Sequence, residues 1–145
     1  MDKFNLQRFL KAQDTNVSNY AVALEEIKNG RKITHWIWYI FPQIEGLGYS
    51  PASEFYAISG LDEARAYFAH PTLKERLIEI SNALLAHQGK SAFEIMGSLD
   101  GLKVRPSMTL FSIACPNEPV FEKVLEVFFN GEQDPNTIRI LNKGL

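Results

Sequence analysis

The sequence predicts an all-α protein, organised as a single compact domain of about eight to ten short helices. Apolar residues recur at helical spacing in several segments, and residues that cap helices stand at the ends of those segments. No segment shows the sustained apolar–polar alternation that predicts a β-strand. The 145 residues match the length of one ordinary domain, so we assign residues 1–145 to one unit.

The most regular helical pattern lies between Pro71 and Gly89. Its apolar residues are spaced by four, three and four positions: Leu73, Leu77, Ile80 and Leu84. Proline suits the first turn of a helix, where an N–H would have no partner, and glycine suits the end of one. The segment is therefore predicted to be a helix with one buried face.

Two further segments stop at an Asn-Gly pair, at residues 29–30 and 130–131. Helically spaced apolar residues precede each pair: Tyr20, Ala23, Leu24 and Ile27 before the first, and Phe121, Val124, Leu125 and Phe128 before the second. Asn and Gly both tolerate the left-handed conformation, so each pair predicts a helix C-cap. Residues 6–10 indicate an opening helix.

Other helices are predicted from their first residues. "SAFE" at residues 91–94 has the form of a capping box, and "DPNT" at residues 134–137 offers an Asp cap followed by Pro. "LFSIAC" is interpreted as the buried end of a helix that begins near Leu99, rather than as a strand.

Composition excludes several classes of function. The formal net charge of −2 argues against a protein-wide basic surface for nucleic acid. No window holds the ~18 uncharged apolar residues of a membrane span, and the N-terminus lacks the apolar core of a signal peptide. We therefore expect a cytoplasmic protein with no membrane partner. The three histidines and single cysteine lack metal-ligand spacing, so no metal site and no cofactor are predicted.

The aromatic segment "THWIWYIFPQ" is the first candidate for a binding site. If residues 34–41 form a helix, His35, Trp38 and Tyr39 share one side, and other apolar residues face the core. With Trp36 and Gln43, these groups are suited to stacking on a flat ring and hydrogen-bonding its edge. The alternative is that the whole segment belongs to the core.

"GLGYSPAS" is the second candidate. Gly46 and Gly48 allow a tight turn, Ser50 is placed as an N-cap, and Ser53 lies in the first turn of the helix that follows. Free amides and hydroxyls at such a helix start can hold an anion such as phosphate. The same pattern also occurs as turn chemistry without a ligand.

"DGLKVRPSMTL" is the third candidate. Lys103 and Arg105 stand two positions apart among apolar residues, and Ser107 follows. Basic groups beside a hydroxyl can bind a phosphate, with arginine in bidentate fashion. The alternative is a solvated helix start in which Arg105 pairs with a surface carboxylate.

Three stretches, in this order and at these separations, resemble the DUF1810 family, an uncharacterised family of small bacterial proteins. They are "HWIWYIFPQIEGLGYSPASEFYAI", "EARAYFAHPTLKERL" and "KVRPSMTLF". The resemblance extends from "FLKAQ" to "DPNTIRIL" and covers nearly the whole chain. It implies a compact all-helical fold and brings no established activity.

A shorter stretch, "YSPASEFYAI", is similar to the "SEHYFQA" segment of the NADAR family, helical proteins associated with ADP-ribose derivatives. A glutamate of that segment is a catalytic candidate in the family. Residue by residue, the similarity falls on Ser53, Glu54 and Tyr56. It implies Glu54 as an acid–base group, with Ser53 and Tyr56 beside the ligand.

The sequence thus predicts a pocket for a phosphorylated, ring-bearing small molecule of the nucleotide or ADP-ribose class. It leaves open whether the protein hydrolyses that ligand, with Glu54 or His35 as acid–base groups, or only binds it. The competing hypothesis is a protein-interaction or homodimerisation module with an aromatic patch of Trp36, Trp38 and Tyr39.

Overall fold

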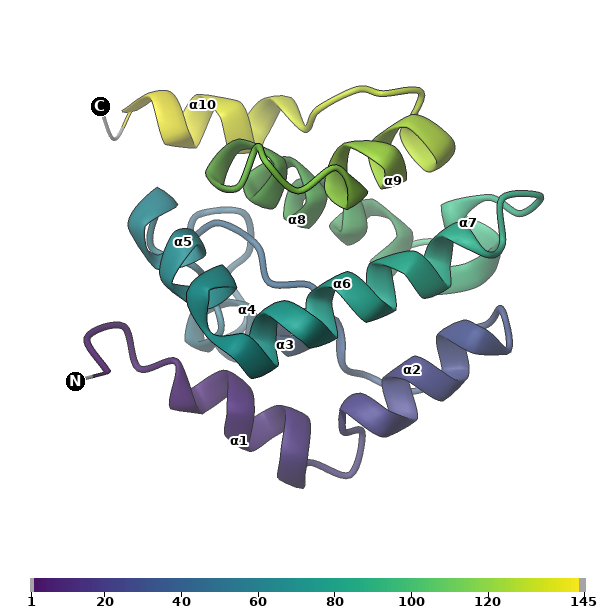
Figure 1. Cartoon of the computed structure of the whole chain (residues 1–145), viewed down its shortest axis with the longest axis horizontal. Coiled ribbons are helices and arrows are strands. Elements are labelled where there is room, and N and C mark those ends of the chain that lie inside the picture. Colours follow the sequence, from purple (N-terminus) through teal and green to yellow (C-terminus); the bar gives the residue numbers. More distant parts are fainter. Residues whose placement is uncertain (1, 144–145) are drawn as a thin grey trace.

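The computed structural model describes residues 2–143, which form ten α-helices and no β-strand (Figure 1). The predicted all-α class is confirmed. The helices are α1 (Gln7–Thr15), α2 (Tyr20–Lys28), α3 (Ile37–Ile40), α4 (Pro51–Phe55), α5 (Leu61–Ala69), α6 (Pro71–Leu85), α7 (Ala92–Met96), α8 (Asp100–Ala114), α9 (Val120–Phe129) and α10 (Pro135–Lys143).

Helices α6 and α8, of 15 residues each, organise the bundle. Helix α8 packs against α5, α7, α9 and α10, and α6 packs against α2, α5 and α9. In Figure 1, α10 runs along one edge of the molecule beside α8, and α1 lies on the opposite edge. The middle of α8 is thereby enclosed on several sides, which explains why its residues from Pro106 to Ser112 are all buried.

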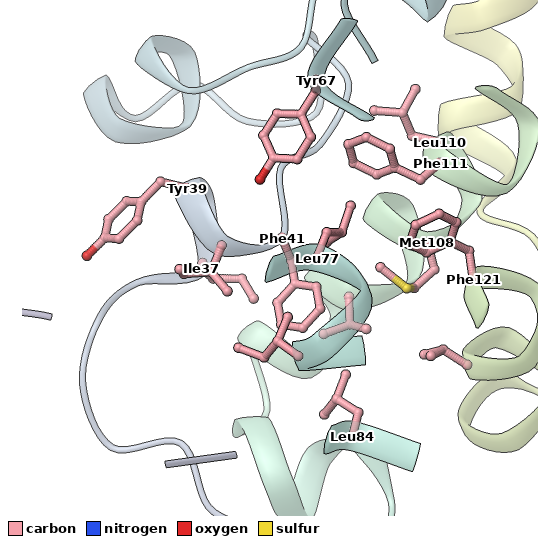
Figure 2. Packing of buried hydrophobic residues seen from close by; sticks show 14 of the residues in the cluster. Ile37, Tyr39, Phe41, Tyr67, Leu77, Leu84, Met108, Leu110, Phe111 and Phe121 are labelled. Carbon is pink, nitrogen blue, oxygen red and sulfur yellow. The ribbon is translucent and has the colours of Figure 1, made fainter. Parts of the chain in front are cut away.

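The core is built from the apolar faces of these helices. Figure 2 shows residues of α3, α6, α8 and α9 meeting around Phe41 and Met108. The predicted apolar face of α6 is buried at all four positions: Leu73, Leu77, Ile80 and Leu84. Each such side chain contributes about 1.5–3 kcal/mol of burial free energy, so the helical periodicity read from the sequence corresponds directly to packing.

The predicted helix ends are confirmed at several positions. Asn130 and Gly131 have φ angles of 56° and 75°, and Gly30 has φ of 77°. Ser91 and Glu94 form a reciprocal capping box, and the carboxylate of Asp134 accepts a hydrogen bond from the Thr137 amide at 2.9 Å. Helix α6 ends at Leu85, four residues before the glycine that was expected to stop it.

Helix α3 is shorter than the predicted helix over residues 34–41. The carboxylate of Glu26 accepts hydrogen bonds from the backbone amides of Ile33 and Thr34, at 2.7 and 3.0 Å. A side chain therefore satisfies these amides in a non-helical segment, and the helix begins only at Ile37. Among residues 2–143, no helix is long and apolar enough to cross a membrane.

Candidate functional site

A cavity of about 230 Å³ lies where the segment after α3 meets α8 and the start of α10. Its walls combine aromatic rings, amides, hydroxyls and one lysine. The lining residues are Trp38, Gln43, Ile44, Gly46, Leu47, Gly48, Ser53, Tyr56, Ala57, Leu102, Lys103, Pro106, Asp134 and Asn136. We call this cavity the α8–α10 pocket.

The pocket collects residues from all three candidate segments. Seven of the predicted site residues line it: Trp38, Gln43, Gly46, Gly48, Ser53, Tyr56 and Lys103. The aromatic segment and the basic segment are more than fifty residues apart in the chain, and the fold brings one part of each to the same cavity. The sequence analysis did not identify the contributions of Leu102, Pro106, Asp134 and Asn136.

Backbone pairing holds the loop that forms one wall. The Ile58 amide donates to the Gln43 carbonyl, and the Glu45 amide donates to the Ile58 carbonyl, both at 2.8 Å. This short parallel bridge closes residues 44–58 into a fixed loop. Within it, a Cβ atom on Gly48 would lie 2.8 Å from the Ser53 hydroxyl oxygen, so the close approach of the chain to Ser53 requires glycine.

Gly46 joins this loop to α10. Its φ of 102° is in the region that favours glycine, and a Cβ there would lie 3.3 Å from Ile140. The close contact between the loop and α10 depends on the missing side chain. Because α10 packs here, Asn136 at its start reaches the wall of the α8–α10 pocket.

Lys103 supplies the positive charge of the pocket. Its ammonium nitrogen lies 5.2 Å from the centroid of the Trp38 ring and 3.2 Å from Oδ1 of Asp100. The other Asp100 oxygen binds Lys32 at 2.7 Å. Burial opposes ionisation of Asp100, but the two lysines outweigh it and hold the pKa of this carboxyl below its ordinary value. Two lysines share one carboxylate, so the group keeps a net positive charge beside the pocket.

Arg105 lies near the pocket but does not line it. Its guanidinium donates to the carbonyl oxygens of Glu132 and Gln133, at 3.0 and 2.8 Å. The neighbouring Thr109 hydroxyl accepts a hydrogen bond from the Asp134 amide at 2.9 Å. Arg105 therefore fixes the linker between α9 and α10 and is not aimed at the cavity.

Two residues of the predicted aromatic wall lie in the core instead. Trp36 is 0% exposed, and its indole N–H donates to Oε1 of Glu26 at 2.9 Å. Tyr39 is buried, its hydroxyl donates to the Ser18 carbonyl at 2.6 Å, and burial raises its pKa. Figure 2 shows Tyr39 among the residues of the hydrophobic cluster. For these two side chains, the structure agrees with the core alternative.

The remaining predicted residues lie outside the pocket lining. His35 and Glu54 are exposed, and Ser50 caps α4 through its hydroxyl, which accepts from the Ser53 amide at 3.2 Å. Ser107 is fully buried in α8, and its hydroxyl oxygen has no hydrogen-bond partner among the described residues.

A second cavity, of about 440 Å³, is larger than the α8–α10 pocket, but most of its charged groups are paired with one another or with Arg8. Three of its four charged lining residues are in ion pairs: Glu63 binds Arg8 at 2.7 Å, and Arg65 lies 3.8 Å from Asp62. The fourth, Lys3, forms no ion pair within residues 2–143. Paired charges have less interaction left to offer a ligand. The smaller cavity is therefore the stronger candidate site.

Fold and site together define a class: an all-α protein with a small aromatic and polar pocket against its central helix. The family model described as "Protein of unknown function (DUF1810)" matches residues 3–141, and the chain belongs to this family. It is also similar to the crystal structure of the conserved hypothetical protein Rv1873 from Mycobacterium tuberculosis, with 41% identity and a TM-score of 0.91. That similarity covers 96% of this chain and 97% of the other.

No match is found among curated proteins. The family match agrees with the predicted resemblance to DUF1810. None of these matches supports the similarity to NADAR proteins, which stays a prediction.

Proposed function

We propose that the α8–α10 pocket binds a phosphorylated, ring-bearing small molecule of the nucleotide or ADP-ribose class. The observation that carries this proposal is the position of Lys103, whose ammonium lies 5.2 Å from the Trp38 ring at the wall of the cavity. A cation beside an aromatic face is suited to a ligand that combines a ring with an anionic group.

Polar groups with unused hydrogen-bonding capacity support the proposal. Among residues 2–143, no hydrogen bond is made by the side-chain amides of Gln43 and Asn136 or by the Tyr56 hydroxyl. Ligand sites typically combine apolar walls with a few such groups, which fix the orientation of the ligand. A side-chain amide can bind the donor and acceptor edge of a heterocycle, and the lining contains two of them.

The size of the pocket limits the ligand. A volume of about 230 Å³ is below the ~300–1,000 Å³ that is usual for drug-sized ligands. We therefore favour a ligand with one ring system and one phosphate group, such as a nucleoside monophosphate. A molecule as large as ADP-ribose would have only one of its parts inside the cavity.

The proposal is limited to binding. Glu54 and His35, the two acid–base candidates, are exposed and do not line the cavity. Asp134, the carboxylate at the wall, already caps α10 through two hydrogen bonds from Thr137. No pair of groups in the lining is arranged for acid–base chemistry on a bound ligand, so binding is the function that we propose to test.

The interaction-module hypothesis has less support. It requires a surface patch of Trp36, Trp38 and Tyr39, and two of these side chains are buried. Of the predicted patch, only Trp38 then keeps an exposed surface, and it is half-buried in the pocket wall.

Isothermal titration calorimetry with AMP, GMP, CMP, UMP and ADP-ribose tests the proposal. We expect saturable binding of at least one monophosphate, weakened at least about tenfold by Lys103→Ala, because a charge-assisted hydrogen bond is lost. Lys123→Ala, at an exposed position of α9, is the matched control and should leave the affinity unchanged. Absence of binding for the whole panel, or equal losses in the two variants, would contradict the proposal.

A further inference from the structure

We infer that the ring of the ligand carries an N–H donor, such as an exocyclic amino group, which is recognised by the Leu102 carbonyl and the free oxygen of Asp134. This inference rests on the proposed function and narrows it to a subclass of heterocycles. It follows from the difference between pocket groups that can either donate or accept a hydrogen bond and groups that can only accept one.

The first fixed acceptor comes from a proline inside α8. Pro106 stands in the middle of the helix, has no N–H, and cannot donate to the carbonyl four residues earlier, which is that of Leu102. Both residues line the α8–α10 pocket, and Leu102 is 59% exposed. The Leu102 carbonyl thus lacks its usual helical donor at a residue of the pocket wall, and a carbonyl oxygen can only accept.

The second fixed acceptor is Asp134, at the start of α10. Both of its hydrogen bonds, from the amide and the hydroxyl of Thr137, end on the same oxygen, Oδ2, at 2.9 and 2.7 Å. Within residues 2–143, Oδ1 accepts no hydrogen bond, and the carboxylate has no ion-pair partner within 4.0 Å. An ionised carboxylate oxygen also only accepts.

The other polar groups of the pocket differ in the hydrogen bonds that they can make. The amides of Gln43 and Asn136 and the hydroxyl of Tyr56 can each present a donor or an acceptor, whereas the Ser53 hydroxyl already donates to the Ser50 carbonyl at 3.0 Å. Lys103 donates only, and we assign it to the anionic group of the ligand. Leu102 and Asp134, which accept only, therefore require a donor elsewhere on the ligand.

An acceptor that faces another acceptor in a closed site loses its bond to water and gains nothing. Sites built to bind a donor reject analogues that lack it, often by large factors. The pocket is partly open, so we expect a moderate effect, at least about tenfold in affinity. If the ligand were held through its phosphate alone, loss of the ring donor would not change the affinity.

Two matched ligand pairs test the inference by calorimetry. AMP is compared with purine riboside 5′-monophosphate, which lacks the amino group and has only acceptors on its ring. CMP is compared in the same way with the 5′-monophosphate of 2-pyrimidinone riboside. We expect the amino member of the binding pair to bind at least about tenfold more tightly. Equal affinities within that pair would overturn the inference and leave the proposed function intact, whereas no binding by any of the four or by the other ligands of the panel would overturn both.

Variants then test which atoms are responsible. Asp134→Asn can keep its capping oxygen and replaces Oδ1 by an N–H₂ group, and Pro106→Ala restores an N–H for the Leu102 carbonyl. Each should reduce the affinity ratio within the pair several-fold. We compare the ratio of the two affinities because a substitution that weakens both ligands equally leaves this ratio unchanged. Pro71→Ala, at the exposed first position of α6, is the control and should leave the ratio unchanged. An unchanged ratio in both pocket variants would also overturn the inference.

Discussion

Trp36 and Trp38 stand two residues apart and have different environments. Trp36 is fully buried and donates to the Glu26 carboxylate, whereas Trp38 is half-buried and lines the α8–α10 pocket. A lysine ammonium lies over each ring: that of Lys32 is 4.8 Å from the centroid of the Trp36 ring, and that of Lys103 is 5.2 Å from the centroid of the Trp38 ring.

Asp100 connects the two tryptophan environments. It binds Lys32, whose side chain is 5% exposed, and Lys103, whose side chain is 33% exposed. The Asp100 carboxylate therefore binds one lysine beside the buried Trp36 and another at the wall of the α8–α10 pocket. Residue type alone therefore does not separate a core tryptophan from one that lines a pocket. The two differ in the hydrogen-bond partner of the indole N–H and in the exposure of the ring to solvent.

Trp36→Ala should have the largest effect on stability. It removes a fully buried indole and takes one donor from the Glu26 carboxylate, so we expect a loss of about 3–5 kcal/mol in the free energy of unfolding. Chemical denaturation followed by circular dichroism measures it. A loss below about 1 kcal/mol would remove the distinction between the two tryptophans.

Glu26→Gln should have the next largest effect. The carboxylate accepts from two backbone amides, the Thr34 hydroxyl and the Trp36 indole, so loss of its charge should cost about 2 kcal/mol of stability. Glu25→Gln, at an exposed position of the same helix, is the matched control and should change stability by less than about 0.5 kcal/mol.

The pH dependence sharpens the same prediction. Burial opposes ionisation of Glu26, but the hydrogen bonds from Thr34, Ile33 and Trp36 outweigh it and hold its pKa below the ordinary value near 4.5. A carboxyl with a lowered pKa in the folded state contributes stability above its unfolded pKa and loses it as the pH falls through the folded value. Denaturation curves should show this acid loss below about pH 4.5, reduced in Glu26→Gln. An identical acid loss in the variant would mean that Glu26 does not contribute to it.

Trp38→Ala should have the smallest effect on stability and a large one on binding. A half-buried side chain at a cavity wall is expected to contribute on the order of 1 kcal/mol to folding. Calorimetry with the monophosphates should show affinity reduced at least about tenfold at nearly normal stability. A stability loss as large as that of Trp36→Ala, with affinity retained, would place Trp38 in the core as well.

The sequence predicts the helices well because their signals are local. The apolar spacing of α6 and the caps at Ser91, Asn130 and Asp134 depend on residues within a few positions, and the structure agrees with them. The predicted helix over residues 34–41 is too long, since the Glu26 carboxylate that accepts from its first amide, that of Thr34, lies on another helix.

The site is predicted only in part because it is made by distant segments. Loop residues such as Gly48 and Ser53 can be recognised in the sequence as a tight turn and a helix start. No local pattern, however, shows that α10 packs beside them. Arg105 is a residue type suited to binding an anion, yet its guanidinium donates to carbonyls of the α9–α10 linker. Those carbonyls are 27 and 28 residues further along the chain, so no local pattern predicts the contact.

The most direct test of the proposed pocket uses the two tryptophans as separate reporters, since the chain contains only these two. Trp36→Phe leaves Trp38 as the single fluorophore, and Trp38→Phe leaves Trp36. Titration with the tightest-binding monophosphate, AMP if none binds more tightly, should give a saturable change in the emission of Trp38 and none in that of Trp36. A silent Trp38 at ligand concentrations up to millimolar, or an equal response from Trp36, would contradict the assignment of the binding site to the α8–α10 pocket.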